Sequence, residues 1–301
     1  MPATLVICFI LLSYINFGST YTYFGHRKGY SAVPPNIPKT AFVIHLSSNN
    51  IQTITEYDFM GFAALHTVNL KDNSIGNISQ NSFQGSPVRK LYLSNNPLRV
   101  FPNLVNLKHN LTYLELSSCS ITNMSANFVI DYDKLDTLIL DSNPIESLPN
   151  MTKFKDKLVK LYLSNCALTV IPSLYFEGFS ALRSLNLAEN KFVNFTAFAF
   201  KGLHSLKYLD LANNKLLENI DPEAFPGLIQ LISFNMHYVD LLKTAPILKN
   251  STKLLTLRIS KTKFEVLPTD FMTHMQGELI SYLSGYFSLK LHSFLLTSTN
   301  A

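Results

Sequence analysis

The chain has 301 residues, three cysteines and a formal net charge of +5. Three cysteines are few for a secreted protein. No run of about 20 apolar residues follows the first 20 residues, which argues against a transmembrane helix. The modest net charge gives no support to a nucleic-acid partner. The eight histidines form no HExxH motif, and the chain has neither a Gly-x-Ser-x-Gly turn nor a glycine-rich phosphate loop. The sequence therefore predicts no enzyme, cofactor or metal site.

Residues 1–20 are predicted to form a signal peptide. The segment from Leu5 to Phe17 is uncharged, apolar and short for a bilayer span, and the small residues at 18–20 suit cleavage. No lysine or arginine precedes the apolar run, so an uncleaved N-terminal membrane anchor is the alternative. Residues 21–40 form a proline-rich lead-in without cysteine, which we expect to protect the first coil.

Residues 41–279 repeat the phrase LxxLxLxxNxL about ten times, at steps of 23 to 25 residues. Its alternating leucines fit the buried side of a short parallel strand, and its asparagine can bond backbone groups that the following turn leaves unpaired. One coil cannot bury its apolar edge alone, so the coils must stack into a solenoid. The ladder position, which is the asparagine of the phrase, is held by Asn49, Asn73, Asn96, Cys119, Asn143, Cys166, Asn190, Asn214, Val239 and Thr262.

The apolar frame of each repeat is expected to face the core. Val239 cannot form a hydrogen bond through its side chain, so we expect either a local irregularity there or a water in the role of asparagine. In one repeat the predicted frame is Leu206, Leu209, Leu211 and Leu216. About ten residues after most ladder positions a phenylalanine returns, which predicts an apolar spine formed by Phe59, Phe83, Phe128, Phe176, Phe200, Phe225 and Phe271.

These repeats resemble the extracellular leucine-rich repeat class that includes Toll-like receptor ectodomains, small matrix proteoglycans and adhesion receptors, over residues 33–279. The resemblance implies an α/β leucine-rich repeat solenoid shaped like a horseshoe, with parallel strands on the concave face and loops, short helices or 3-10 turns on the convex face. The paired cysteines of the family's caps are missing. Residues 280–301 lose the period and offer no polar cap, so we expect a truncated or spliced form of a longer receptor-like chain.

Cys119 and Cys166 occupy ladder positions two coils apart. Stacked strands are about 4.8 Å apart, which separates the two cysteines by roughly 10 Å, beyond the ~7 Å that a disulfide tolerates between Cα atoms. We therefore predict two buried free thiols.

Six N-x-[ST] sequons support passage through the secretory pathway. None lies between the first repeat leucine and the ladder residue of its coil, so sugars would coat the edge and back and leave the strand face bare. The alternative is that strand geometry simply disfavours sequons. The predicted glycosylation sites are Asn77, Asn110, Asn123, Asn150, Asn194 and Asn250.

Outward strand positions of successive coils should stack into two columns, one from His45 to Arg258 and one from Val43 to Thr256. Exposed tyrosines with mixed charge are typical of protein-binding surfaces, although tyrosine is also simply a good strand residue. The candidate ligand-binding residues are Lys90, Tyr92, Tyr113, Glu115, Ile139, Lys160, Tyr162, Tyr208 and Asp210.

The sequence thus predicts a secreted or extracellular recognition module that binds a protein or glycan through its concave face, alone or as part of a receptor ectodomain at the cell surface. A structural matrix protein is the alternative. The only Ser-Gly pair, at residues 284–285, has no acidic neighbours for glycosaminoglycan attachment, which favours the first hypothesis.

Overall fold

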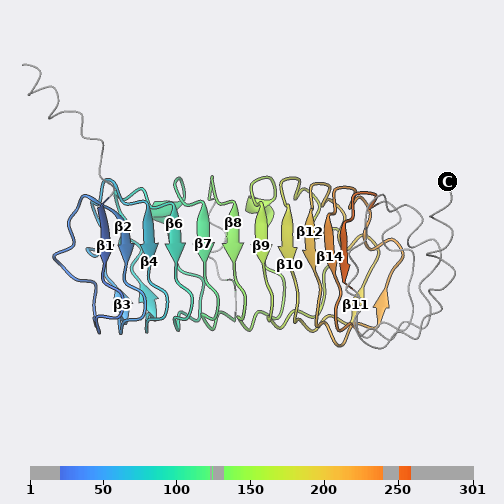
Figure 1. Ribbon diagram of the computed structural model, residues 1–301, viewed down its shortest axis with the longest axis horizontal. Helices are drawn as coiled ribbons and strands as arrows, with labels where there is room; N and C mark the ends of the chain where they lie inside the picture. The colour runs from blue at the N-terminus through green and yellow to red at the C-terminus, as the bar shows by residue number, and fades with distance from the viewer. Residues whose placement is uncertain (1–20, 123, 125–131, 240–250, 259–301) are drawn as a thin grey trace, which may run out of the picture.

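The computed structural model describes residues 21–122, 124, 132–239 and 251–258, which form a solenoid of stacked coils. One parallel sheet of 11 strands runs along the whole described length, and the strands follow one another in chain order (Figure 1). The leucine-rich repeat solenoid predicted from the sequence is therefore confirmed. The sheet contains β1 (Tyr21–Phe24), β2 (Ala41–His45), β4 (Thr67–Asn69), β6 (Lys90–Tyr92), β7 (Tyr113–Glu115), β8 (Thr137–Ile139), β9 (Lys160–Tyr162), β10 (Ser184–Asn186), β12 (Tyr208–Asp210), β14 (Ser233–Asn235) and β15 (Thr256–Arg258).

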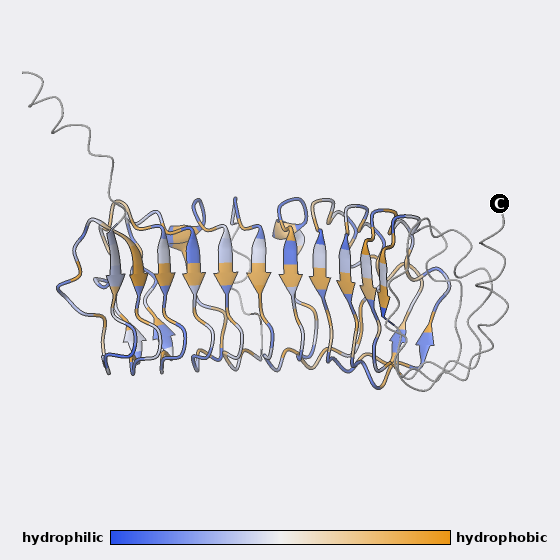
Figure 2. Ribbon diagram, in the orientation of Figure 1, coloured by the Kyte–Doolittle hydropathy of each residue, from blue (hydrophilic) through white to orange (hydrophobic). Residues whose placement is uncertain are grey.

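Little other regular structure occurs among the described residues, which include no α-helix. Two small sheets pair β3 (Thr53–Ile54) with β5 (Asn77–Ile78) and β11 (Asn194–Phe195) with β13 (Asn219–Ile220), and two 3-10 turns span Val105–Leu107 and Thr152–Phe154. In Figure 2 the hydropathy colour changes along each three-residue strand, because the middle residue is a leucine or another apolar residue and lies between two outward residues. In the part of the chain that the structure describes, no helix is long and apolar enough to cross a membrane.

The asparagine ladder joins neighbouring coils through side-chain amides. Asn143 Nδ2 donates to the carbonyl oxygens of Leu116, in the coil before, and Leu140, in its own coil, both at 2.8 Å. Its Oδ1 accepts the N–H groups of Cys119 and Ile121 at 2.9 and 3.0 Å. These bonds satisfy backbone groups in the dry interior, where an unpaired polar group is costly. The same two-carbonyl pattern recurs at Asn49, Asn73, Asn96, Asn190 and Asn214.

The two cysteines of the ladder reproduce only the donor half of this pattern. Cys119 is a buried free thiol whose Sγ lies 3.3 Å from the carbonyl oxygen of Leu93. It offers no amide oxygen to the coil before, and there the Leu98 N–H instead bonds the carbonyl oxygen of Asn96 at 2.8 Å, across Pro97. The predicted buried thiols are confirmed, and Cys166 repeats the arrangement with Asn143, Pro144 and Ile145.

A spine of phenylalanine rings fills the core opposite the sheet. Phe59 and Phe83 stack with their ring centroids 5.1 Å apart. Phe176, Phe200 and Phe225 form a second stack, with centroids 5.9 and 4.6 Å apart. All five rings are buried, so the predicted spine is confirmed for the described phenylalanines.

One coil precedes the predicted first repeat. β1 pairs in parallel with β2, and Lys28 stands where the other coils have their ladder residue, because its N–H donates to Asn49 Oδ1 at 2.9 Å. The sequence does not reveal this coil, since residues 21–30 contain no leucine. The lead-in therefore extends the sheet instead of merely covering it.

Two tyrosines end the hydrophobic core in this first coil. Gly25 takes an inward position, where a Cβ would lie 2.7 Å from the Tyr23 ring and 2.9 Å from the Leu46 side chain. The rings of Tyr23 and Tyr30 pack against the core and their hydroxyl groups lie 3.4 Å apart. A tyrosine covers apolar surface while its hydroxyl stays polar, so the coil closes the core without a disulfide.

The coil of Asn214 departs from the predicted frame. The sequence predicts that Leu216 is buried, but Leu216 is 54% exposed and Leu217 is fully buried. The next ladder position is Val239, 25 residues on, against 24 residues from Asn190 to Asn214. The extra residue is taken up in a turn where the Leu217 N–H bonds the Asn214 carbonyl oxygen at 3.1 Å.

Several predictions lie outside the described residues. They concern residues 1–20, Asn123, Phe128, the 240–250 segment with Asn250, Thr262, Phe271 and the tail 280–301.

Candidate ligand-binding site

The structure places the predicted outward residues in the two expected columns. Strand pairing sets His45 beside Asn69, Asn69 beside Tyr92 and Tyr92 beside Glu115, and it continues in this way to Arg258. The neighbouring column runs from Val43 to Thr256 with equal regularity. The first column continues through Ile139, Tyr162, Asn186, Asp210 and Asn235, and the second contains Thr67, Lys90, Tyr113, Thr137, Lys160, Ser184, Tyr208 and Ser233.

The most connected group on this face comes from β6 and β7. The rings of Tyr92 and Tyr113 pack at 4.9 Å between centroids, tilted by 39°. Tyr113 donates its hydroxyl hydrogen to Glu115 Oε2 at 3.0 Å. Lys90 lies exposed beside them, so the group presents aromatic surface and both signs of charge.

Two further residues belong to this group, and the sequence analysis did not single them out. Lys71 Nζ lies 2.6 Å from Glu115 Oε1 and 5.3 Å from the centroid of the Tyr92 ring. Ser94 Oγ donates to the same carboxylate oxygen at 2.8 Å. Lys71 directly follows Leu70 and Ser94 directly follows Leu93, which is a third repeat position beside the two columns; Lys71 is partly exposed there and Ser94 is buried. Reading this position as a column would have found them. We call Lys71, Tyr92, Ser94, Tyr113 and Glu115 the tyrosine cluster.

Burial shapes the ionisation of this surface. Desolvation raises the pKa of Tyr113 far above its usual value, and the hydrogen bond to Glu115 adds to the effect. Desolvation also raises the pKa of Asp141, with a smaller contribution from the carboxylates of Glu115 and Glu189, although Asp141 accepts the Ser164 N–H at 2.7 Å. Tyr113 therefore remains a neutral hydrogen-bond donor at all physiological pH values.

The other predicted residues form a looser continuation. Ile139 lies between Glu115 and Tyr162 in the first column. Tyr162 is half-buried and its hydroxyl lies 3.4 Å from Ser184 Oγ. Tyr208 is 50% exposed. Asp210 accepts the side-chain amide of Asn235 at 3.1 Å, and Lys160 is exposed.

The arrangement is suited to ligand binding more than to catalysis. Among the described residues, no group of three or more His, Cys, Asp or Glu side chains could hold a metal ion. The face instead presents phenol rings, a lysine and a carboxylate that contact one another. Such a surface is suited to contact with a macromolecule.

The described sequon asparagines lie away from the strand face. Asn77 and Asn194 are exposed in β5 and β11, which belong to the two small sheets. Asn219 donates its side-chain amide to Asn194 Oδ1 at 3.2 Å. Asn150 is exposed and Asn110 is half-exposed.

Comparison with known proteins agrees with the repeat architecture. A leucine-rich repeat family model matches residues 42–98 and 156–216, and a second matches residues 205–228. Asporin from Bos taurus is 33% identical over 99 residues, which are 32% of this chain and 26% of asporin. The structure of TLR13 in complex with ssRNA13 superposes with a TM-score of 0.65 at 21% identity, over 83% of this chain and 41% of TLR13. The chain therefore spans less than half the length of either protein.

Proposed function

Since the chain is a leucine-rich repeat protein whose fold resembles Toll-like receptor ectodomains, we propose that it is a non-enzymatic extracellular recognition module. It binds a protein or glycan ligand through the strand face, as a secreted protein or as part of a receptor ectodomain. The tyrosine cluster carries the proposal: paired tyrosine rings of the outward columns lie together with a preformed Lys71–Glu115 ion pair.

Physical chemistry supports this face as the binding surface. A tyrosine contributes a large contact area with few rotatable bonds, so ordering it costs little entropy, and its hydroxyl can still bond a partner. The ion pair is already formed, which lowers the cost of arranging these charges when a ligand binds. Sequons at Asn77 and Asn194 lie in the small sheets, so sugars attached there leave this surface accessible.

The first test concerns location. Expression of the full chain in a secretory cell line should give a band in the medium that shifts after glycosidase treatment. Retention of an unshifted band inside the cell would contradict the extracellular assignment. Substitution of Asn77 and Asn194 by Gln, alone and together, shows which sequons are used.

The second test concerns the face. Ligands captured from a library of secreted proteins and glycans should lose at least tenfold in affinity for Tyr92→Ala, a loss expected when an interface aromatic is truncated. Tyr57→Ala is the matched control, because Tyr57 is 70% exposed and lies outside the sheet. Single-stranded RNA is included because TLR13 is seen bound to it. Equal losses in the two variants, or RNA as the tightest ligand, would contradict the proposal.

A further inference from the structure

The most exposed tyrosine of the described residues lies outside the strand face. Tyr57 is 70% exposed and stands in the turn after β3, two residues before Phe59, which is fully buried in the phenylalanine spine. Hydrogen bonds fix this turn. Asp58 Oδ2 accepts the Thr55 N–H at 2.6 Å, and the Phe59 N–H donates to the carbonyl oxygen of Ser82 in the next coil at 3.1 Å. Because Phe59 is held in the core, the turn leaves the Tyr57 ring in solvent.

Carboxylates flank Tyr57 on both sides in the sequence. Glu56 precedes it and Asp58 follows it. A hydrogen bond with Glu56 raises the pKa of the Tyr57 phenol, so the phenol keeps its proton at physiological pH. The structure describes three other tyrosines that are more than a third exposed, and none of them has an acidic residue next to it in the sequence. They are Tyr21, Tyr208 and Tyr238.

A second tyrosine has the same acidic neighbours, but the fold covers it. Tyr132 follows Asp131 and precedes Asp133 in the sequence. Its side chain is fully buried, and its ring stacks on Phe154 with the centroids 6.2 Å apart. The sequence therefore contains two acid-flanked tyrosines, and the structure leaves only Tyr57 accessible to another protein.

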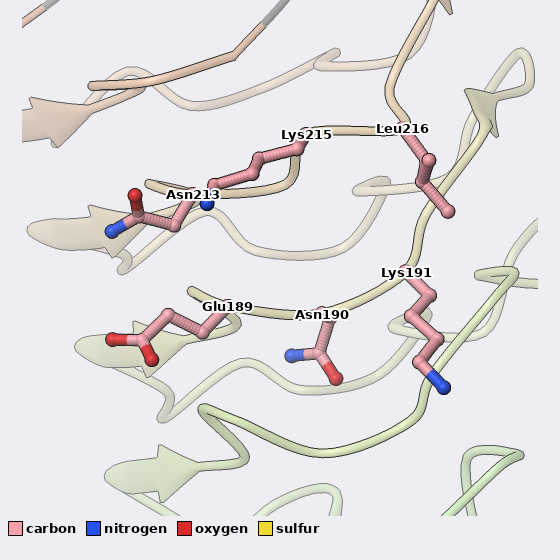
Figure 3. A pocket seen from close by; sticks show the side chains of 6 residues that line it. All are labelled: Glu189, Asn190, Lys191, Asn213, Lys215 and Leu216. Carbon is pink, nitrogen blue, oxygen red and sulfur yellow. The ribbon is translucent and has the colours of Figure 1, made fainter.

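A recess of about 520 Å³ between the turns that follow β10 and β12 has no comparable grouping of side chains (Figure 3). Lys191 points away from the gap, and the ammonium group of Lys215 lies beside Asn213. The charged side chains that line this recess therefore do not converge on the exposed Leu216. At Tyr57, by contrast, a reactive hydroxyl group and two carboxylates stand together in one turn.

We infer that Tyr57 is a sulfation site, at which a sulfotransferase of the secretory pathway transfers the sulfo group of phosphoadenylyl sulfate to the phenol. A bond forms between the phenol oxygen and sulfur, and the bond between sulfur and the phosphate oxygen of the donor breaks. Adenosine bisphosphate leaves, and the phenol proton passes to a base of the transferase. Sulfation of Tyr57 rests on the proposed function, since the chain meets this transferase only in the secretory pathway.

The turn meets the requirements of this transfer. The transferase binds a polyanionic donor, so its active site is cationic and attracts the carboxylates of Glu56 and Asp58. The phenol has to enter that active site, and the exposed ring of Tyr57 can do so without unfolding of its coil. The sulfate ester adds a negative charge to a recess of about 180 Å³ that Tyr57 lines together with the cation Lys39.

The test in cells uses the full chain, expressed in a secretory cell line that is fed radioactive sulfate. N-glycans are removed enzymatically before counting, because they also carry sulfate. The remaining label should be recovered as tyrosine sulfate after alkaline hydrolysis, and Tyr57→Phe should abolish it. The double variant Glu56→Gln/Asp58→Asn keeps the phenol and should lower the label about fivefold or more, because the attraction to the transferase is lost.

Two matched controls separate exposure from acidic neighbours. Tyr132 has the acidic neighbours without the exposure, and Tyr208 is 50% exposed but lacks them. Tyr132→Phe and Tyr208→Phe should therefore carry as much tyrosine sulfate per chain as the wild type. Loss of the label in either control, with Tyr57→Phe still labelled, would place the modification elsewhere and overturn the inference.

A purified system keeps this inference apart from the proposed function. The folded full chain, incubated with tyrosylprotein sulfotransferase and phosphoadenylyl sulfate, should take up sulfate at Tyr57, as located by mass spectrometry. Absence of uptake would overturn the inference, and so would a secreted, glycosylated chain without tyrosine sulfate, which leaves the proposed function standing. A chain that takes up sulfate at Tyr57 in the purified system but stays unglycosylated inside the cell would contradict the proposed function, while Tyr57 would stand as a sulfotransferase substrate.

Discussion

Cys119 donates its thiol hydrogen to the carbonyl oxygen of Leu93 at 3.3 Å, a bond that Asn96 makes with its amide to Leu70 at 3.0 Å in the coil before. The cysteine at this ladder position is accompanied by a proline in the coil before. Pro97 directly follows Asn96 and allows the tight turn in which the Leu98 N–H bonds the Asn96 carbonyl oxygen, so no amide oxygen is needed from position 119. Proline fixes its own φ near the value that such a turn requires. The equivalent pairing is Pro144 with Cys166.

This relationship predicts that substitutions by alanine at different ladder positions lower the unfolding free energy by different amounts. Asn143→Ala removes bonds to two carbonyl oxygens and two N–H groups, and it leaves those groups buried. We expect a loss of about 3 kcal/mol or more in unfolding free energy, because each unsatisfied buried group costs about 1–3 kcal/mol. Cys166→Ala removes only long thiol bonds and should cost about 1 kcal/mol. Urea titration by circular dichroism measures both, and equal losses would contradict the assignment.

The thiols of Cys119 and Cys166 should be unreactive in the folded chain. Both are buried, and desolvation raises the pKa of each to about 11, so little thiolate exists at pH 8. The thiolate is the reactive form. With Cys8 replaced by serine, Ellman's reagent should detect no thiol in native protein and both thiols in 6 M guanidinium. Rapid reaction of either thiol in the native state would show that its coil opens.

The repeat frame and the strand register could be read from the sequence, because a period of 23 to 25 residues leaves one way to stack the leucines. Every described member of the two columns lies where the spacing places it. The first coil escaped this reading, since Gly25, Tyr23 and Tyr30 build its core without a leucine.

Only part of the tyrosine cluster could be predicted from the sequence, for a related reason. Tyr92, Tyr113 and Glu115 were found because they alternate with leucines in the strand, but Lys71 and Ser94 follow the strand, at a third repeat position that the two-column prediction did not include. The pattern also misplaced Leu216. Nothing local distinguishes Leu216 from Leu217, and only stacking against the neighbouring coil decides which of them is buried.

Asp141 should make the protein less stable at neutral pH than its amide variant. The folded-state pKa of Asp141 is raised by desolvation, so above that pKa the folded state holds an unfavourable charge, and below the unfolded pKa the penalty disappears. Asp141→Asn keeps an acceptor for the Ser164 N–H. We expect it to be more stable than the wild type at pH 7, with the difference shrinking to zero as the pH falls below about 4. Thermal melts of both proteins from pH 3 to 7 measure this.

The exposed carboxylate Asp156 supplies the control, because Asp156→Asn should change the melting temperature little at any of these pH values. A stabilisation by Asp141→Asn that is the same at pH 3 and pH 7 would mean that the charge is not its cause.

Glu115 should be the residue on which the tyrosine cluster depends. Its carboxylate bonds Lys71, Ser94 and Tyr113, and its side chain is only 12% exposed. Glu115→Gln cannot accept all three donors, so we expect a loss of about 1–3 kcal/mol in unfolding free energy. The surface pair Lys201 and Glu177, with side chains 45% and 54% exposed, is the matched control. Glu177→Gln should cost at most about 0.5 kcal/mol.

A double-mutant cycle separates the ion pair from the other two bonds of Glu115. Lys71→Met should cost less in the Glu115→Gln background than in the wild type, because its partner charge is already gone. The difference between the two costs is the coupling free energy, expected at about 1 kcal/mol for a half-buried pair. The same cycle at Lys201 and Glu177 should give a coupling near zero. Equal couplings at the two pairs would mean that the cluster is ordinary charged surface, and the case for it as a preformed binding face would be lost.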